Sequence, residues 1–490
     1  MRIVLPIIVF CSGAIVMILE LTASRIVAPY LGTSVIIWTS LIGVILAALA
    51  VGNWLGGRIA DRYPMPHVLA PLLLGGAVLI ALITQFESLL SVVSTTFDPL
   101  SAAVVGVCVL FGPATIILGT IAPFAVKLSL ATSETSGRIV GNLFAVSNAG
   151  SIIGTFLGGF ILISLIGSTR IIMLIAITLA CLAFLVLIVA RKKPSIGIWI
   201  GVAVLAILLM APQRGMVVPG GGKLVADVDT LYSRTWIVEE SFGEYTARTM
   251  RNSFQRYQSG ILIEHPDVPL FAYIRMYDVF EAFAPEATHA LMIGGSAYTY
   301  PRYFLAQDSS RYMTVVEIDP GVTELARQHF GLTDDPRLTI VHEDGRTYLN
   351  SRDEDYEVIF IDAFNSNHTI PFHLTTHEAI HAISRNLAPH GIVMMNIISP
   401  LEGGRSAFLA AEYATYREVF PYVKLYQVDL ERGSHEDQNI MLIASHQELT
   451  PEASSRYAAE LAEKEWRGEI AQIPPLTDDF APVERYTSVL

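Results

Sequence analysis

The sequence predicts an α-helical transmembrane domain followed by an α/β domain with a doubly wound sheet, itself preceded by a small antiparallel β domain. Three observations support this fold class. Only 16% of the 490 residues are charged, against about 25% in average globular domains. Residues 1–214 hold 11 Lys/Arg and 5 Asp/Glu, whereas the remainder holds 21 and 40. Long apolar runs fill the first part, and short β-rich runs alternate with helical stretches in the second.

The apolar part predicts about seven membrane-spanning helices within residues 1–214. A span needs about 20 mostly apolar residues, and lipid favours helices because it offers no partners for free backbone groups. The loops on the side of the N-terminus hold eight Lys/Arg and those on the other side hold two. This bias predicts that the N-terminus lies in the cytoplasm. Seven crossings would then put the acidic part outside, so either the weakest candidate is not a span or the acidic part is external. The candidates are 4–24, 34–55, 68–86, 101–125, 139–166, 170–190 and 195–212.

The acidic part predicts two further regions, a β-rich region over 215–285 and a Rossmann-like region over 286–490. Residues 233–241, 244–252 and 257–265 have the pattern of an antiparallel meander. The later strands are continuously apolar and separated by helices, which is typical of a parallel sheet covered on both faces. These strands are 288–295, 312–319, 337–344, 356–364, 391–398, 422–429 and 439–445.

Polar residues or glycines follow the first four of these strands. Gly294 and Gly295 would let a ligand approach the backbone, and Glu317 stands about 20 residues later, where an acid can bind ribose hydroxyls. Asp344, before Gly345, is placed to accept an adenine amino group, and Asp362 ends the fourth strand. Strand-end acids often cap helices instead. Four in order nevertheless indicate a nucleoside site at the carboxyl edge of the sheet.

The residues around these strand ends resemble spermidine synthases and related aminopropyltransferases. The similar segments are VVEIDPGVTELARQHF, VHEDGRTYL, VIFIDAF and YSRTWIVEE, and the terminal LTDDFAPVE with the apolar half resembles the membrane-fused branch of that family. The resemblance implies that Asp362 is the general base, and that Tyr273 and Asn365 lie at the amine. It implies that the nucleoside of decarboxylated S-adenosylmethionine is bound by Gln258, Gly294, Gly295, Glu317, Asp344 and Gly345.

The sequence departs from the family at the amine. The family's glycine-rich turn carries an Asp where this chain has Ala297, and the second Asp of its catalytic loop is Asn365 here. The polar residue that follows the pocket tyrosine is Ile274. Two carboxylates that would hold a cation are therefore absent, which weakens the binding of a dication such as putrescine.

Three functions stay open from the sequence. The first is a membrane-bound aminopropyltransferase acting on putrescine or a related amine, and the second is an S-adenosylmethionine-dependent methyltransferase on the same fold. The third is a transporter or sensor with a nucleoside- or polyamine-binding domain, because GGRIADRYP (56–64) resembles a cytoplasmic loop of major-facilitator transporters. We expect a multi-pass plasma-membrane protein in a lipid membrane, with homo-oligomerisation open.

Composition also predicts what the protein does not use. An acidic domain repels phosphates, so we expect no nucleic-acid partner. The three cysteines lie in apolar runs, which favours neither a disulfide framework nor a cysteine metal site. We therefore expect no metal and no permanently bound cofactor.

Overall fold

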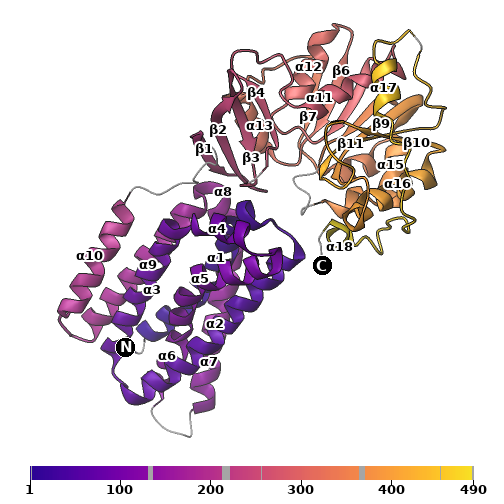
Figure 1. Ribbon diagram of the computed structural model, residues 1–490. Coiled ribbons are helices and arrows are strands. Elements are labelled where there is room, and N and C mark those ends of the chain that lie inside the picture. Colours follow the sequence, from indigo (N-terminus) through magenta and orange to yellow (C-terminus); the bar gives the residue numbers. More distant parts are fainter. Residues whose placement is uncertain are drawn as a thin grey trace. The chain divides into compact units, whose positions relative to one another are not determined.

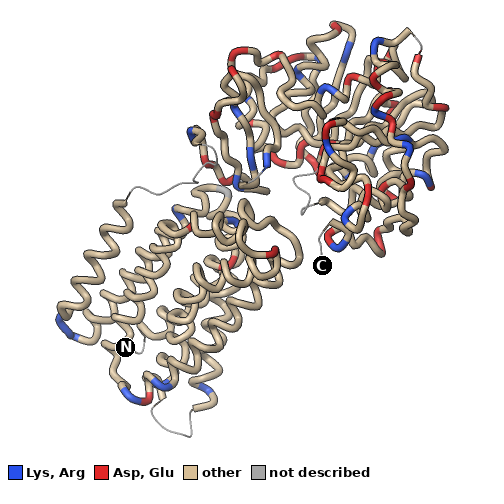
Figure 2. Tube along the Cα trace, viewed as in Figure 1, with Lys and Arg blue, Asp and Glu red and all other residues tan. Residues whose placement is uncertain are grey.

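The computed structural model describes residues 1, 3–130, 136–211, 221–254, 256–363, 370–452 and 454–487. The chain divides into two compact units. The first contains Met1–Pro219 together with Asp227–Arg234, and the second contains Gly220–Ala226 and Thr235–Leu490. Charged residues are sparse along the long helices of the first unit and frequent throughout the second (Figure 2).

The first unit is built from apolar helices, with α1, α3, α5 and α9 packed side by side (Figure 1). These segments are apolar around their whole circumference, and in lipid a helix satisfies the backbone polar groups of such a segment internally. The helices are α1 Val4–Leu31, α2 Val35–Arg62, α3 Leu69–Phe86, α4 Leu89–Thr96, α5 Pro99–Gly119, α6 Ile121–Ser129, α7 Ser136–Phe156, α8 Ile163–Ile166, α9 Ser168–Val189 and α10 Ile196–Met210, with a 3-10 turn η1 Pro66–Val68 and a π turn η3 Leu157–Leu162.

Six helical segments among the described residues are long and apolar enough to cross a membrane. They match the first six sequence candidates. The seventh candidate, 195–212, forms α10, which has only 15 residues. At about 1.5 Å per residue such a helix is about 22 Å long, short of a hydrocarbon core about 30 Å thick. The structure therefore departs from the expected seven long spans at this helix.

The stretch Asp227–Arg234 packs within the first unit through a buried ionic cluster. Arg234 donates to Glu87 at 2.6 Å and to Asp227 at 2.7 Å, and the side chains of Arg234 and Glu87 are 4% and 7% exposed. Asp229 accepts from the backbone nitrogen of Ser168 at 2.6 Å, at the start of α9. These contacts fix the stretch because buried charges are tolerated only when they are paired.

The second unit begins with a four-stranded antiparallel sheet in the order β1-β2-β3-β4. The meander expected over 233–265 is β2 Arg234–Phe242, β3 Tyr245–Arg251 and β4 Ser259–Leu262. β1 Lys223–Asp229 adds a strand that the sequence pattern did not reveal. The short helix α11 Ala272–Met276 and the 3-10 helix η5 Tyr277–Ala282 follow.

A seven-stranded sheet in the order β10-β11-β9-β8-β5-β6-β7 forms the centre of the second unit. All seven expected strands are present. β5 to β9 pair with one another in parallel, but β11 is antiparallel to both β9 and β10, so the expectation of a fully parallel sheet is wrong at this edge. Ten residues join β10 to β11, which is too short for a parallel crossover. The strands are β5 His289–Ile293, β6 Tyr312–Val316, β7 Leu338–Val341, β8 Tyr356–Ile361, β9 Leu387–Ser399, β10 Tyr422–Gln427 and β11 Gln438–Ser445.

Helices cover both faces of this sheet, which confirms the doubly wound α/β fold (Figure 1). Alternate strand residues point to opposite faces. Accordingly Ile359 belongs to one buried apolar cluster and Phe360 to another. The helices are α12 Thr299–Gln307, α13 Pro320–His329, α14 Gly345–Ser351, η6 Phe372–Leu374, α15 His377–Arg385, η7 Gly404–Ser406, α16 Ala407–Val419, α17 Ala458–Lys464 and α18 Val483–Thr487.

Candidate active site

The candidate site lies at the carboxyl ends of four adjacent parallel strands. In the sheet these strands run in the order β8-β5-β6-β7, and they end before Asp362, Gly294, Glu317 and Asp344 respectively. Because parallel neighbours end at the same edge, the structure brings these four sequence-predicted positions together.

The glycine turn after β5 has an unusual backbone. Gly294 has φ +98°, and Ser296 and Tyr298 also have positive φ values, of +47° and +56°. A Cβ on Gly294 would lie 2.4 Å from the carbonyl oxygen of Asp362, and one on Gly295 would lie 2.7 Å from the Tyr298 ring. Both glycines are therefore required by the turn itself, which lies directly beside Asp362.

Both oxygens of the Glu317 carboxylate accept hydrogen bonds from backbone amides. Its Oε2 accepts from the nitrogens of Gly295 at 2.9 Å and Ser296 at 3.1 Å, and its Oε1 accepts from Asp319 at 3.0 Å. Burial raises the pKa of Glu317, and these three amide donors oppose the shift. Glu317 therefore holds the glycine turn in shape as well as presenting an acid at the strand end.

Asp344 caps the helix that follows β7. Its Oδ1 accepts from the Thr347 nitrogen at 2.9 Å, and its Oδ2 lies 3.0 Å from Nε2 of His373. A Cβ on Gly345 would lie 2.7 Å from a methyl group of Ile293, so glycine allows α14 to pack closely against β5. Asp344 therefore caps the helix through one oxygen and contacts His373 through the other.

Asp362 has an electrostatic setting suited to proton transfer. Burial raises its pKa to about 6, although the Asn396 amide and the Tyr277 hydroxyl both favour the carboxylate form. Asn396 Nδ2 donates to Asp362 Oδ1 at 3.4 Å. A carboxyl with a pKa about one unit below neutrality can both accept and release a proton near pH 7.

Aromatic side chains lie next to Asp362. The Tyr273 ring stacks on Phe271 at 6.1 Å and meets Tyr277 edge-on at 6.3 Å. Tyr273 also donates to the backbone carbonyl of Gln258 at 3.3 Å, so the expected amine-side and nucleoside-side residues are neighbours. Burial, followed by the charge of Asp362, raises the pKa of Tyr273, which therefore stays a neutral phenol.

The sequence lacks a carboxylate at two positions on the amine side, and the structure describes one of them. Ala297 is fully buried and packs with Ile237, Met250 and Val322 in an apolar cluster. No carboxylate can act from that position. Asn365 lies outside the described residues, so its place in the site stays a prediction.

Three residues near the site were not predicted from the sequence. They are Asn396 and Tyr277, which act on Asp362, and His373, which contacts Asp344. Asn396 lies inside β9, one residue after Met395, which pairs with Ile361 at the end of β8; its only sequence signal is a polar residue within an otherwise apolar run. His373 lies in a 3-10 turn and carries no such signal, because only the folded chain brings it to Asp344.

Comparisons with known proteins match the part of the chain that contains this site. Residues 271–448 match the family model described as the spermine/spermidine synthase domain. A polyamine aminopropyltransferase of Vibrio vulnificus is 26% identical over 194 residues, 39% of this chain and 63% of that protein. Polyamine aminopropyltransferase 1 of Streptomyces coelicolor is 23% identical over 423 residues, 81% of this chain and 76% of that protein.

The chain thus spans less than two thirds of the Vibrio relative's length. Among solved structures, a probable spermidine synthase from Corynebacterium glutamicum aligns with a TM-score of 0.42 and 24% identity, covering 49% of this chain and 86% of the other. Over residues 271–448 the chain is therefore similar to the spermine/spermidine synthase domain, and through this part to the polyamine aminopropyltransferases.

Proposed function

We propose that the protein is a membrane-bound aminopropyltransferase that moves the aminopropyl group of decarboxylated S-adenosylmethionine to putrescine or a related amine. The observation that carries the proposal is Asp362, an acid with a pKa raised to about 6 beside the glycine turn. The names of the relatives support the same reaction class.

The chemistry requires little more than a base and good positioning. The acceptor nitrogen attacks the aminopropyl carbon next to the sulfonium, a C–N bond forms, and the C–S electron pair returns to sulfur as methylthioadenosine leaves. The nitrogen must be neutral to attack, so Asp362 accepts its proton. Because the sulfonium is already a good leaving group, alignment of the two substrates supplies most of the catalysis.

The nucleoside would lie along the strand ends next to Asp362. Glu317 would bind the ribose hydroxyls and Asp344 the base amino group. The backbone beside Gly294 could approach the ligand closely because glycine carries no side chain. The full set of proposed contacts is Gln258, Gly294, Gly295, Glu317, Asp344 and Gly345.

A methyltransferase is the second candidate, and the burial of Ala297 favours it. The resemblance assigns the Asp at this position to the amine of the aminopropyl group, and the buried Ala297 supplies no anion for that amine. In the proposed aminopropyltransferase the acceptor would lie against Tyr273, and Asn365 is expected beside it from the sequence alone. An acceptor with one amine and an apolar or neutral remainder suits that lining better than an acceptor with two charged amines.

The six long helices support a multi-pass membrane location. The basic loops predict that the N-terminus lies in the cytoplasm. With alternating crossings, Glu87 after α3 and Ser168 at the start of α9 then lie on the opposite side, and the stretch Asp227–Arg234 that leads into β2 binds both. These contacts favour a position of the α/β unit opposite the N-terminus, which a chemical label on an exposed residue within 235–490 would test.

The test is a product assay on the full chain in detergent. Decarboxylated S-adenosylmethionine and putrescine should yield methylthioadenosine, and Asp362→Asn should lower turnover about 10²- to 10⁴-fold. The matched control is Asp355→Asn, an exposed acid just before the start of the same strand. S-adenosylhomocysteine formed from S-adenosylmethionine, without methylthioadenosine, would favour the methyltransferase instead. Unchanged turnover in Asp362→Asn would refute the general base.

A further inference from the structure

The C-terminal segment 476–480 is an integral part of the α/β unit. Leu476 is 1% exposed within the main apolar cluster. Its carbonyl accepts from the His377 nitrogen at 2.8 Å, and its own nitrogen donates to the Thr415 hydroxyl at 2.9 Å. The Asp478 nitrogen donates to Glu378 at 3.0 Å. The segment is therefore held in place against α15 and α16.

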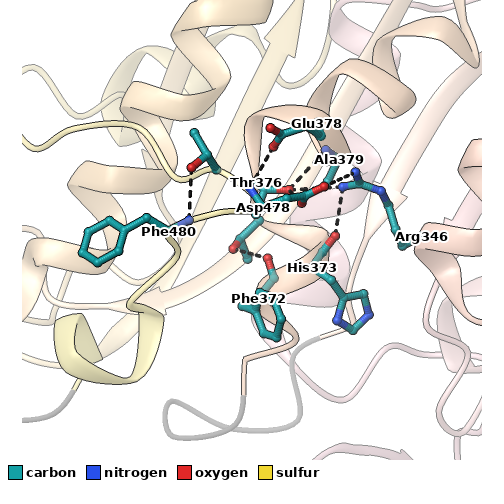
Figure 3. Close-up of polar contacts among 10 residues, drawn as sticks. Arg346, Phe372, His373, Thr376, Glu378, Ala379, Asp478 and Phe480 are labelled. Atoms are coloured by element: carbon teal, nitrogen blue, oxygen red, sulfur yellow. Dashed lines mark hydrogen bonds and ion pairs between the residues drawn. The ribbon is translucent and has the colours of Figure 1, made fainter.

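The Asp478 side chain bridges two elements next to the candidate site (Figure 3). One carboxylate oxygen accepts from Arg346 at 3.0 Å, and the other accepts from the Thr376 hydroxyl at 2.6 Å. Arg346 is the second residue of α14, two positions after Asp344. Its side chain is only 14% exposed, whereas that of Asp478 is 49% exposed, so the ion pair is shielded from water on the arginine side alone.

Arg346 also holds the residue that contacts Asp344. Its Nη1 donates to the carbonyl oxygen of His373 at 3.1 Å, as Figure 3 shows. The His373 imidazole in turn places Nε2 3.0 Å from Asp344 Oδ2. An ionised carboxylate only accepts hydrogen bonds, so Nε2 carries the hydrogen and donates it.

We propose that Asp478, through Arg346 and His373, positions the Asp344 carboxylate for the base of the nucleoside. This inference rests on the proposed function, because it assumes that Asp344 receives an adenine amino group. Without the His373 contact, Oδ2 of Asp344 would lose the neighbour that fixes its direction, while Oδ1 would remain bound to Thr347. Asp478, Arg346 and His373 are thus positioning residues, and the C-terminal segment is part of the nucleoside site.

A purely structural role makes a different prediction. Thr376 caps α15 and contacts both Asp478 and Arg346, so the network could serve only to join that helix to the C-terminal segment. In that case the loss of Asp478 would lower stability or weaken all ligands alike. If the network positions Asp344, its loss should weaken ligands that carry the base amino group and spare those that lack it.

The test compares binding of methylthioadenosine and methylthioinosine to the full chain in detergent by calorimetry. Loss of one hydrogen-bonded contact corresponds to roughly a 3- to 10-fold weaker affinity, so Asp478→Asn should weaken methylthioadenosine by that factor. Methylthioinosine has a carbonyl in place of the amino group and should be almost unaffected. Asp479→Asn, at the exposed neighbouring acid, is the matched control and should leave both affinities unchanged.

Variants of His373 test the same step without disturbing the C-terminal segment. His373→Gln keeps a donor that can reach Asp344 and should retain most of the preference for methylthioadenosine, whereas His373→Phe should lose it. Equal weakening of both nucleosides, or no weakening, in Asp478→Asn and His373→Phe would overturn the positioning role. A wild-type chain that binds neither nucleoside would instead contradict the proposed function, and the role of Asp344 with it.

Discussion

The Asn396 amide offers a direct way to change the acidity of Asp362. Asn396→Leu removes the donor that favours the carboxylate form. A hydrogen bond to a charged group contributes about 1.5–3 kcal/mol, and at 3.4 Å the lower end applies. Since about 1.4 kcal/mol equals one pKa unit, the pKa of Asp362 should rise from about 6 to roughly 7.

The measurement is the pH profile of kcat/KM for methylthioadenosine release between pH 5 and 9. A general base must be ionised, so wild-type activity should rise with pH through about 6 and be about 90% developed at pH 7. In Asn396→Leu about half of the enzyme should be active at pH 7, while the plateau at pH 9 should be nearly unchanged. Folding should tolerate the change, because Asn396 Oδ1 is a buried acceptor that has no partner among the described residues.

Two outcomes would refute this reasoning. If Asn396→Leu lowers the plateau at every pH without moving the acidic limb, the amide contacts substrate and does not tune the base. If the remaining activity of Asp362→Asn still falls at acidic pH in the same way, the acidic limb of the profile reports the titration of another group. Asp355→Asn, the exposed control just before the opposite end of β8, should reproduce the wild-type profile.

Three further changes follow from the same geometry. Gly294→Ala places a methyl group 2.4 Å from the Asp362 carbonyl oxygen at a backbone φ of +98°. The free energy of unfolding should fall by about 1–3 kcal/mol in thermal unfolding, and calorimetry should detect no methylthioadenosine binding. Arg234→Met leaves Glu87 buried without its cation and should destabilise the first unit by about 3–5 kcal/mol in detergent unfolding; adding Glu87→Leu should recover part of that loss. Glu412 is fully buried, and burial raises its pKa well above the usual value. The folded state therefore binds this proton more tightly than the unfolded state, so the stability that it contributes is lost as pH rises from about 4.5 through the folded-state pKa. Glu412→Gln should remove that decline in thermal midpoints measured from pH 5 to 8; an unchanged decline would contradict it.

Sequence reasoning placed the backbone of the site because strand patterns are local. The apolar runs that end at Gly294, Glu317, Asp344 and Asp362 are visible without knowing what lies beside them. Adjacent parallel strands then bring these ends to one edge by geometry alone. The four positions could therefore be assigned to one site before any side-chain contact was known.

Long-range contacts account for what the sequence could not predict. Asn396 reaches Asp362 from 34 positions away, and Asp478 reaches Arg346 from 132 positions away. Nothing in the residues around Asp478 indicates this partner. The antiparallel edge formed by β11 was missed for a similar reason, because an apolar run has the same pattern in either direction.

The proposed site divides into a nucleoside side, formed by the glycine turn with Glu317 and Asp344, and an amine side that lacks the family's carboxylates. On the first, Gly294 can be replaced only at the cost of a clash with the backbone of Asp362, so the fold itself fixes this residue. On the second, Ala297 is a fully buried member of an apolar cluster and supplies no charge. A chain of this architecture can therefore keep its nucleoside and its base while it changes the molecule that it modifies. This separation explains how the resemblance can be strong at Glu317, Asp344 and Asp362 and yet fail at the amine.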